Sequence, residues 1–228
     1  MIPANGAKSE VYVEKITGNP NHLMLTRIIL LLLVVISAAS SCGDSQNKLS
    51  PLSPDATILA FGDSLTYGTG ANNGQNYPSQ LAKLTTLKVI NEGIPGELSI
   101  NGLARLPALL DKHNPDLLIL IHGGNDILRK HSRIELKQNI LKMILISQQH
   151  DVEVILLGVP EPGIFLKSAA VYKEISEETS TVAELTLLAV ILGDHSLKSD
   201  ISHPNAKGYL TLAEGIAIFL KKHGALAE

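Results

Sequence analysis

Four short apolar runs, each bounded by Gly, Pro or Asp, alternate with longer segments of helical periodicity. The apolar runs cover residues 57–61, 88–91, 117–121 and 152–159. Runs of this kind are typical of strands that are buried on both faces of a sheet. In residues 100–110, 136–145 and 209–220, apolar side chains recur every three to four positions, which predicts amphipathic helices, the first with a kink at Pro107. Strands that alternate with such helices predict an α/β fold with a parallel sheet, right-handed crossovers and helices on both sides.

The composition supports one globular domain and excludes several classes of function. Of the 228 residues, 45% are hydrophobic and 18% are charged, which suffices for a packed core and is too few charges for a disordered chain. No internal repeat or second hydrophobic pattern calls for another domain. A net charge of −3, without Trp, argues against a nucleic-acid partner. The single Cys excludes an internal disulfide, and no Cys/His spacing indicates a zinc site.

The N-terminal 41 residues read as a leader with a secretory signal peptide. Residues 28–36 are all aliphatic, follow Arg27 and precede small residues. This stretch is too short for a transmembrane helix, which needs ~20 apolar residues. A start at Met24 gives a signal of ordinary length, so we expect residues 1–23 not to belong to the natural protein.

Cys42 lies at the expected cleavage point. Residues 39–42, Ala-Ser-Ser-Cys, resemble the lipobox of bacterial lipoproteins, although Ala39 stands where Leu is usual. We therefore expect lipidation of Cys42, a membrane anchor and a periplasmic location in the cell envelope. The alternative is a cleaved, secreted protein whose signal happens to contain a cysteine. Residues 42–54, rich in Ser, Pro, Asp and Asn, are expected to be a tether, and residues 55–223 the folded domain.

Four polar segments stand where ligands bind in an open parallel sheet, at the carboxyl ends of strands or just before the last helix. They are Gly62-Asp63-Ser64-Leu65-Thr66, residues 91–97, Gly123-Gly124-Asn125-Asp126, and Asp200-Ile201-Ser202-His203-Pro204. Together they supply a hydroxyl group, a flexible backbone donor, a carboxamide, a carboxylate and an imidazole.

This set of groups meets the requirements of acyl transfer. A serine hydroxyl needs an adjacent base, and the base needs an orienting acceptor. We expect Ser64 to be the nucleophile, His203 the base and Asp200 the group that orients the imidazole. The backbone amides of Ser64 and Gly96 and the side-chain amide of Asn125 are expected to donate to the developing oxyanion.

The same residues carry a resemblance to a known family. The four segments resemble the conserved blocks of the SGNH hydrolases, also called the GDSL family, and within it the bacterial thioesterase I, lysophospholipase and arylesterase group. The similarity extends from about Asp55 to about Leu220. It implies a flavodoxin-like three-layer α/β/α fold and ester or thioester hydrolysis without a metal or cofactor. It also implies the triad and oxyanion donors named above. One departure is Ile201-Ser202, where the family usually has Gly-Ile.

Each site assignment has a competing interpretation. Gly93 is the alternative to Gly96 as oxyanion donor, and Asn125 could merely cap a helix. His195 precedes His203 by eight residues but lacks the Asp-x-x-His arrangement. A glycosidase pair of Glu92 and Glu161 has no other support.

Two broader alternatives fit less well. His113, His122 and His131 are nine residues apart, which matches no zinc motif. The α/β-hydrolase fold needs Gly-x-Ser-x-Gly after a mid-sheet strand, but Thr66 stands two residues after Ser64, and Ser64 follows the first strand.

The substrate is expected to be a small-molecule ester with an apolar acyl group. An apolar loop follows the fourth strand, and we expect its residues Ile164 and Phe165 to line an acyl groove. Lysophospholipids, fatty-acyl thioesters and aryl esters fit such a groove. The alternatives are a carbohydrate O-acetyl esterase with the same triad and a non-catalytic envelope lipoprotein of this fold.

Overall fold

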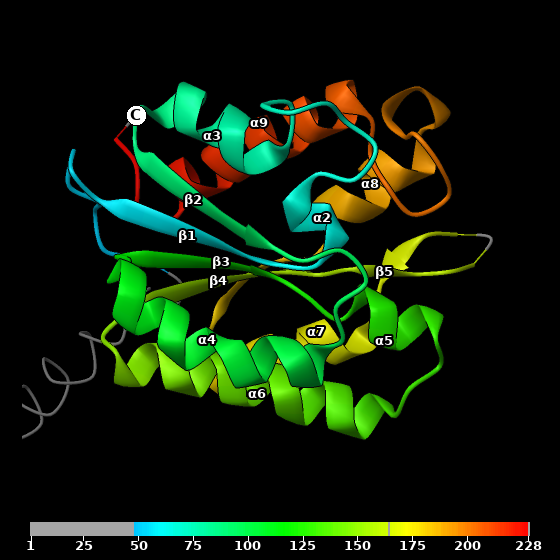
Figure 1. Cartoon of the computed structure of the whole chain (residues 1–228), viewed down its shortest axis with the longest axis horizontal. Helices are drawn as coiled ribbons and strands as arrows, with labels where there is room; N and C mark the ends of the chain where they lie inside the picture. Colours follow the sequence, from blue (N-terminus) through cyan, green and yellow to red (C-terminus); the bar gives the residue numbers. More distant parts are fainter. Residues whose placement is uncertain (1–47, 164, 228) are drawn as a thin grey trace, which may run out of the picture. The chain divides into compact units, whose positions relative to one another are not determined.

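A computed structural model describes residues 48–163 and 165–227. At its centre lies a parallel sheet with the strand order β2-β1-β3-β4-β7 (Figure 1). Its strands are β1 (Thr57–Gly62), β2 (Lys88–Gly93), β3 (Leu117–Ile121), β4 (Glu153–Leu157) and β7 (Val182–Glu184). Numbered along the chain, the strands have the order 2-1-3-4-5 of flavodoxin-like folds, in which the strand order changes direction between β1 and β3. The predicted three-layer α/β fold is confirmed.

Helices cover both faces of the sheet (Figure 1). One layer contains α2 (Ser64–Tyr67), α3 (Tyr77–Thr85), α8 (Leu187–Gly193) and α9 (Ala206–Lys222). The other contains α4 (Ser99–His113), α5 (Gly124–Leu128), α6 (Arg133–Gln149) and α7 (Ala170–Thr179). A hairpin of β5 (Pro160–Glu161) and β6 (Lys167–Ser168) follows β4, and the short helix η1 (His195–Leu197) precedes α9. All three long helices predicted from periodicity are present, and α4 continues across Pro107.

The core lies on both sides of the central strands. Every residue of β1 and β3 is buried, as predicted from their continuous apolar runs. The prediction of burial on both faces is wrong for β2, whose residues are exposed or half-buried. β2 is an edge strand, so only β1 pairs with it. β7 was not predicted, because three residues are too short a run to stand out.

Residues 49–52 lie against the folded domain. Leu49 is buried in the core, and its N–H donates to the carbonyl of His223 at 2.8 Å. Leu52 donates to Ala225 at 2.9 Å, and Ser50 donates to the carboxylate of Glu153 at 2.9 Å. We call residues 49–52 the N-terminal strap.

The strap corrects the predicted domain boundary. The tether was expected to run to residue 54, but the packed domain begins by Leu49, and it extends past residue 223 to the buried Ala225. The predicted leader, the signal peptide and Cys42 lie outside the described residues. Among the helices of residues 48–163 and 165–227, none is long and apolar enough to cross a membrane.

Candidate active site

Ser64 stands directly after the carboxyl end of β1, where α2 begins. Asp63 caps this short helix, and its carboxylate accepts a hydrogen bond from the N–H of Leu65 at 3.1 Å. At Gly62, a Cβ atom would overlap the carbonyl oxygen of Ile121, so only glycine lets the two central strands approach this closely. The tight turn leaves Ser64 half-buried at the sheet edge predicted for ligands.

His203 reaches Ser64 from the loop before α9. Its Nε2 lies 2.9 Å from the Oγ of Ser64, although 139 residues separate the two in the chain. The other ring nitrogen, Nδ1, lies 2.8 Å from the carboxylate of Asp200. The structure therefore brings together all three side chains that were expected to form a triad.

Asp200 is held by its own turn. Its Oδ1 accepts the backbone N–H groups of Ser202 at 2.7 Å and of His203 at 2.9 Å. Partial burial acts to raise the pKa of Asp200, but these hydrogen bonds and the His203 ring outweigh it and hold the pKa below its ordinary value. The ionised carboxylate favours the imidazole tautomer with its proton on Nδ1. Nε2 is then free to accept the proton of Ser64.

Asn125 connects the segments that carry the expected oxyanion donors. Its Nδ2 donates to the backbone carbonyl of Glu97 at 3.1 Å and to the carboxylate of Asp63 at 3.3 Å. Glu97 follows Gly96, and Asp63 precedes Ser64, so this amide joins the two loops. Asn125 does not cap α5, because Gly123 occupies the N-cap position.

Gly96 and Gly93 differ in what their backbones can do. Gly96 is exposed and has φ +78°, a conformation that favours glycine, and its carbonyl accepts from Arg129 at 3.2 Å. The N–H of Gly93 already donates to Asn91 at 2.9 Å. A Cβ at Gly93 would overlap the backbone nitrogen of Tyr67. Gly93 thus allows β2 and α2 to pack closely, and its N–H is already hydrogen-bonded to Asn91.

Asp63 is a buried carboxyl group beside the site that the sequence analysis did not single out. Only 1% of its surface is exposed, and burial raises its pKa against the lowering effects of His122 and of the Leu65 N–H. Its place within Gly62-Asp63-Ser64-Leu65 was the signal that could have identified it. Asp63 caps α2, which begins at Ser64, and its carboxylate accepts a hydrogen bond from Asn125. One side chain thus positions both Ser64 and Asn125.

A second buried cluster supports the loop that contains Gly96. The Glu97 carboxylate accepts from Arg105 at 2.7 Å and lies 3.1 Å from Nε2 of the fully buried His122. Burial acts to raise the pKa of Glu97, but its hydrogen bonds to His122 and Arg105 hold the pKa below its ordinary value. Arg105 also stacks 4.2 Å above the ring of Phe61. We call Glu97, Arg105 and His122 the buried clamp.

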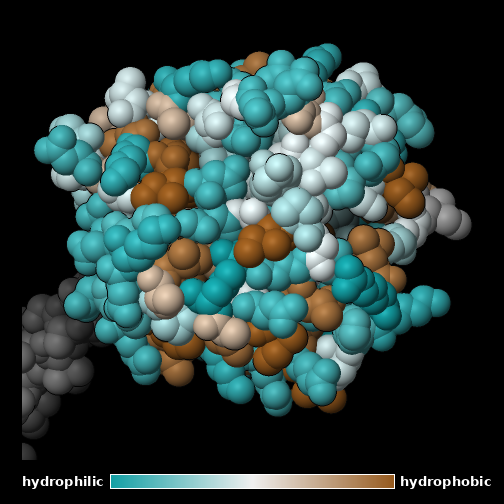
Figure 2. Space-filling view, viewed as in Figure 1, coloured by the Kyte–Doolittle hydropathy of each residue, from teal (hydrophilic) through white to brown (hydrophobic). Residues whose placement is uncertain are grey.

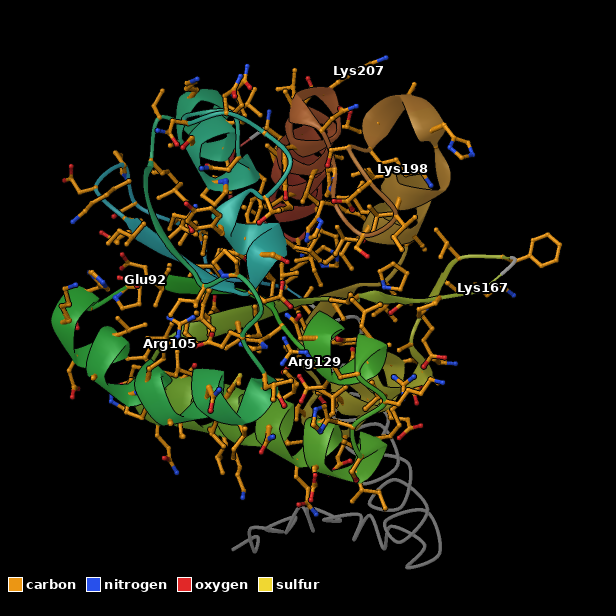
Figure 3. The ribbon with its side chains drawn as sticks, turned by 45° about the vertical axis from the view of Figure 1, so that its right-hand side comes forward. Glu92, Arg105, Arg129, Lys167, Lys198 and Lys207 are labelled. Carbon is orange, nitrogen blue, oxygen red and sulfur yellow. The ribbon has the colours of Figure 1, made fainter. Side chains whose placement is uncertain are left out.

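The other candidate groups have structural partners. The carboxylate of Glu92 lies 2.8 Å from Nε2 of His113 and 3.9 Å from Nη1 of Arg105. Figure 3 labels Glu92 and Arg105, which lie next to each other. Glu161 pairs with Arg133 at 2.7 Å. The two acids therefore belong to separate ion pairs and do not form the glycosidase arrangement.

Ser64 and His203 open onto a cavity of about 870 Å³. Its walls include Val159, Leu166 and Leu192. Phe165 lies at the edge of this cavity with 82% of its surface exposed, so its part in an acyl groove stays a prediction. Ile164, the other residue expected to line the groove, lies outside the described residues. Figure 2 shows apolar side chains at the right-hand edge of the molecule, where Figure 1 places α8 and β5.

A 2-1-3-4-5 parallel sheet that carries a connected Ser–His–Asp set at its switch point defines an α/β serine hydrolase of the SGNH type. The model of the GDSL-like Lipase/Acylhydrolase family matches residues 60–210, and the chain belongs to this family. It is accordingly a serine hydrolase that acts on ester bonds.

Individual relatives agree with this membership. An arylesterase of Vibrio mimicus is 30% identical over 177 residues, which cover 73% of this chain and 88% of the relative. Thioesterase 1/protease 1/lysophospholipase L1 of Escherichia coli (strain K12) is 28% identical and covers 71% of this chain and 81% of its own length. The crystal structure of the psychrotrophic esterase EstA from Pseudoalteromonas sp. matches with a TM-score of 0.67 and 26% identity, over 74% of this chain and 98% of that chain.

Proposed function

We propose that the chain hydrolyses carboxylic esters or thioesters with extended acyl groups through a covalent intermediate on Ser64. One observation carries the proposal. The Oγ of Ser64 lies 2.9 Å from Nε2 of His203, and both residues line a cavity whose walls include the apolar Val159, Leu166 and Leu192. A nucleophile, its base and a site for an acyl chain thus adjoin one another.

The reaction proceeds in two halves. Ser64 Oγ attacks the substrate carbonyl carbon while its proton moves to Nε2 of His203, and Asp200 stabilises the resulting imidazolium. The tetrahedral intermediate collapses, and His203 returns the proton to the departing alcohol or thiol. Water then attacks the acyl carbonyl carbon and gives a proton to His203. The second tetrahedral intermediate collapses as its bond to Ser64 Oγ breaks, and His203 returns the proton to that oxygen, which releases the acid and restores the Ser64 hydroxyl.

The oxyanion is stabilised by the amides of Ser64 and Gly96 and by Asn125. Both hydrogens of the Asn125 amide have partners in the free site, and the bond to Asp63 is the longer one at 3.3 Å. The oxyanion therefore replaces Asp63 as the acceptor of that hydrogen. Removal of one such donor typically costs ~10²–10³ in turnover, about 2.7–4 kcal/mol.

Lysophospholipids are the substrates that best combine these features with an envelope location. The named relatives include an arylesterase and a thioesterase/lysophospholipase, which supports esters with apolar groups. Acyl-CoA is less suitable outside the cytoplasm. The envelope location rests on the apolar residues 28–36 and on lipidation of Cys42. Labelling with palmitate, abolished in Cys42→Ala, tests the anchor.

A panel of nitrophenyl esters of increasing acyl length tests the function. The wild type should prefer medium or long chains, Ser64→Ala should be inactive, and a fluorophosphonate probe should label Ser64. Phe165→Ala should shift the chain-length preference toward shorter esters. Activity on acetyl esters alone would favour a carbohydrate O-acetyl esterase, and failure to label Ser64 would indicate a non-catalytic binding protein.

A further inference from the structure

Four large apolar side chains surround the mouth of the cavity and point into solvent. They are Leu128, Phe165, Val190 and Ile201, with exposed fractions of 49%, 82%, 65% and 87%. Phe165 and Ile201 are the most exposed large apolar side chains in the described part of the chain. We call these four residues the apolar rim.

The apolar rim is assembled from four separate elements. Leu128 ends α5, Phe165 lies in the β5–β6 hairpin, Val190 lies on α8 and Ile201 lies in the loop before α9. Exposed apolar side chains are normal when they are scattered, but a cluster around a cavity marks an interaction surface. Their convergence marks this end of the molecule as a surface for an apolar partner.

The charges beside the apolar rim are mainly positive. Lys167 and Lys198 line the cavity, and Arg129 and Lys130 directly follow Leu128. Figure 3, which brings this end forward, shows Arg129, Lys167 and Lys198 on it. Among the described residues that line the cavity, the only acid is Asp63, which is buried.

Three acids near the mouth offset these cations only in part. Asp200 is engaged with His203, and Glu161 pairs with Arg133. Asp194 is exposed and caps η1 through a hydrogen bond from Ser196. The mouth is thus locally basic in a chain whose net charge is −3.

We propose that the apolar rim docks the protein on the surface of an anionic phospholipid bilayer, so that the cavity opens directly onto lipid. Apolar side chains that enter the interface together with lysines that meet anionic headgroups form a typical peripheral membrane-binding surface. A second copy of the chain is a poorer partner, because a symmetric contact would bring the same cations face to face. Docking allows a lipid substrate to enter the cavity without first crossing water.

The experiment places an environment-sensitive fluorophore on the apolar rim of the full-length protein. The background carries Cys42→Ala, which removes the native thiol and its lipid, and Ser64→Ala, which prevents hydrolysis. Ile201→Cys and Val190→Cys report from the rim. Ile218→Cys on α9 and Leu145→Cys on α6 are controls, with exposed fractions of 67% and 54% in the parent residues. Each is labelled with nitrobenzoxadiazole and mixed with vesicles of phosphatidylglycerol and phosphatidylcholine.

We expect a blue shift and a rise in fluorescence at residues 201 and 190 and no shift at residues 218 and 145. Lys167→Glu should lower the affinity for the vesicles, measured from the lipid concentration at half-maximal shift, at least about fivefold. Lys88→Glu, at the opposite edge of the sheet, should leave this affinity unchanged. Four outcomes overturn the proposal: no shift at the rim, equal shifts at all four positions, equal shifts with purely zwitterionic vesicles, or a shift produced by raising protein concentration without vesicles. Because Ser64 is absent, the result does not depend on the proposed hydrolysis.

Discussion

Single residues at this site serve more than one purpose, and Glu97 is the clearest case. Its backbone carbonyl accepts a hydrogen bond from the side-chain amide of Asn125. Its carboxylate accepts a hydrogen bond from Arg105 and lies within hydrogen-bonding distance of His122. Hydrogen bonds to both the side chain and the backbone of Glu97 therefore hold the loop that contains Gly96 in place. Such a preorganised loop can direct an amide toward developing charge without reorganisation.

The lowered pKa of Glu97 predicts a specific pH dependence of stability. Because folding favours the carboxylate form, its contribution is complete above the ordinary pKa of 4.5 and is lost as the pH falls through the lower folded-state value. Glu97→Gln should reduce the free energy of unfolding by about 1–3 kcal/mol at pH 7. The deficit should shrink below about pH 4.5. Urea denaturation of both proteins between pH 3 and pH 7 measures this, and a constant deficit would contradict the pKa argument.

The triad could be predicted from sequence, whereas the buried clamp could not. The triad residues Ser64, Asp200 and His203 stand in short polar segments that can be recognised in the sequence without knowing the fold. Glu97 and Arg105 are eight residues apart, and His122 lies seventeen further on, so no local pattern relates them. Only the packing of α4 beside the ends of β2 and β3 brings them together.

Elements position the site through close approach of their backbones. The helix α4 passes so near β3 that a Cβ at Gly102 would overlap the ring of His122. At the other face, the short α2 lies against the end of β2. The site is thus held between two layers that meet at the carboxyl ends of the central strands.

Gly102→Ala should displace the His122 ring and weaken its contact with Glu97. The clash should cost about 1–3 kcal/mol, more than the ~1 kcal/mol that alanine contributes over glycine within a helix. Gly193→Ala is the matched control, because nothing lies within 4 Å of its added Cβ at the end of α8. Chemical denaturation should show destabilisation only for Gly102→Ala. Equal stability of the two variants would mean that α4 shifts freely.

Strands and helices could be predicted where their burial produces a recognisable pattern of apolar residues in the sequence. β1, β3 and β4 appear as apolar runs because helices cover both of their faces. β2 was placed correctly but assigned too much burial, since a single sequence does not tell which strand lies at an edge. The three residues of β7 and the two-residue strands of the hairpin carry no periodicity to detect.

At the scale of the whole molecule, the N-terminal strap joins both ends of the described chain. Leu49 and Leu52 pair with the carbonyls of His223 and Ala225, and Ser50 meets Glu153 at the start of β4. The sequence interpretation assigned these residues to a tether because their polar neighbours dominate the composition. One buried leucine was enough to reverse that assignment.

Removal of the strap should destabilise the entire domain. Leu49→Ala should cost about 2–3 kcal/mol of the free energy of unfolding, because a buried side chain is lost from the core. Leu52→Ala, at a partly buried position, should cost less. Thermal unfolding should show a single transition at a lower Tm for Leu49→Ala. An unchanged Tm would show that the strap does not contribute to the core in solution.

The strap lies at the edge of the sheet where the parallel strands begin, and the cavity lies where they end. Both chain ends of the domain therefore leave from the side remote from the opening, as the position of the C-terminus in Figure 1 illustrates. A bead, reporter or carrier attached through the C-terminus would leave the opening unobstructed and turned outward. Immobilisation through the C-terminus should thus preserve turnover, whereas coupling through surface lysines would modify Lys167 at the mouth.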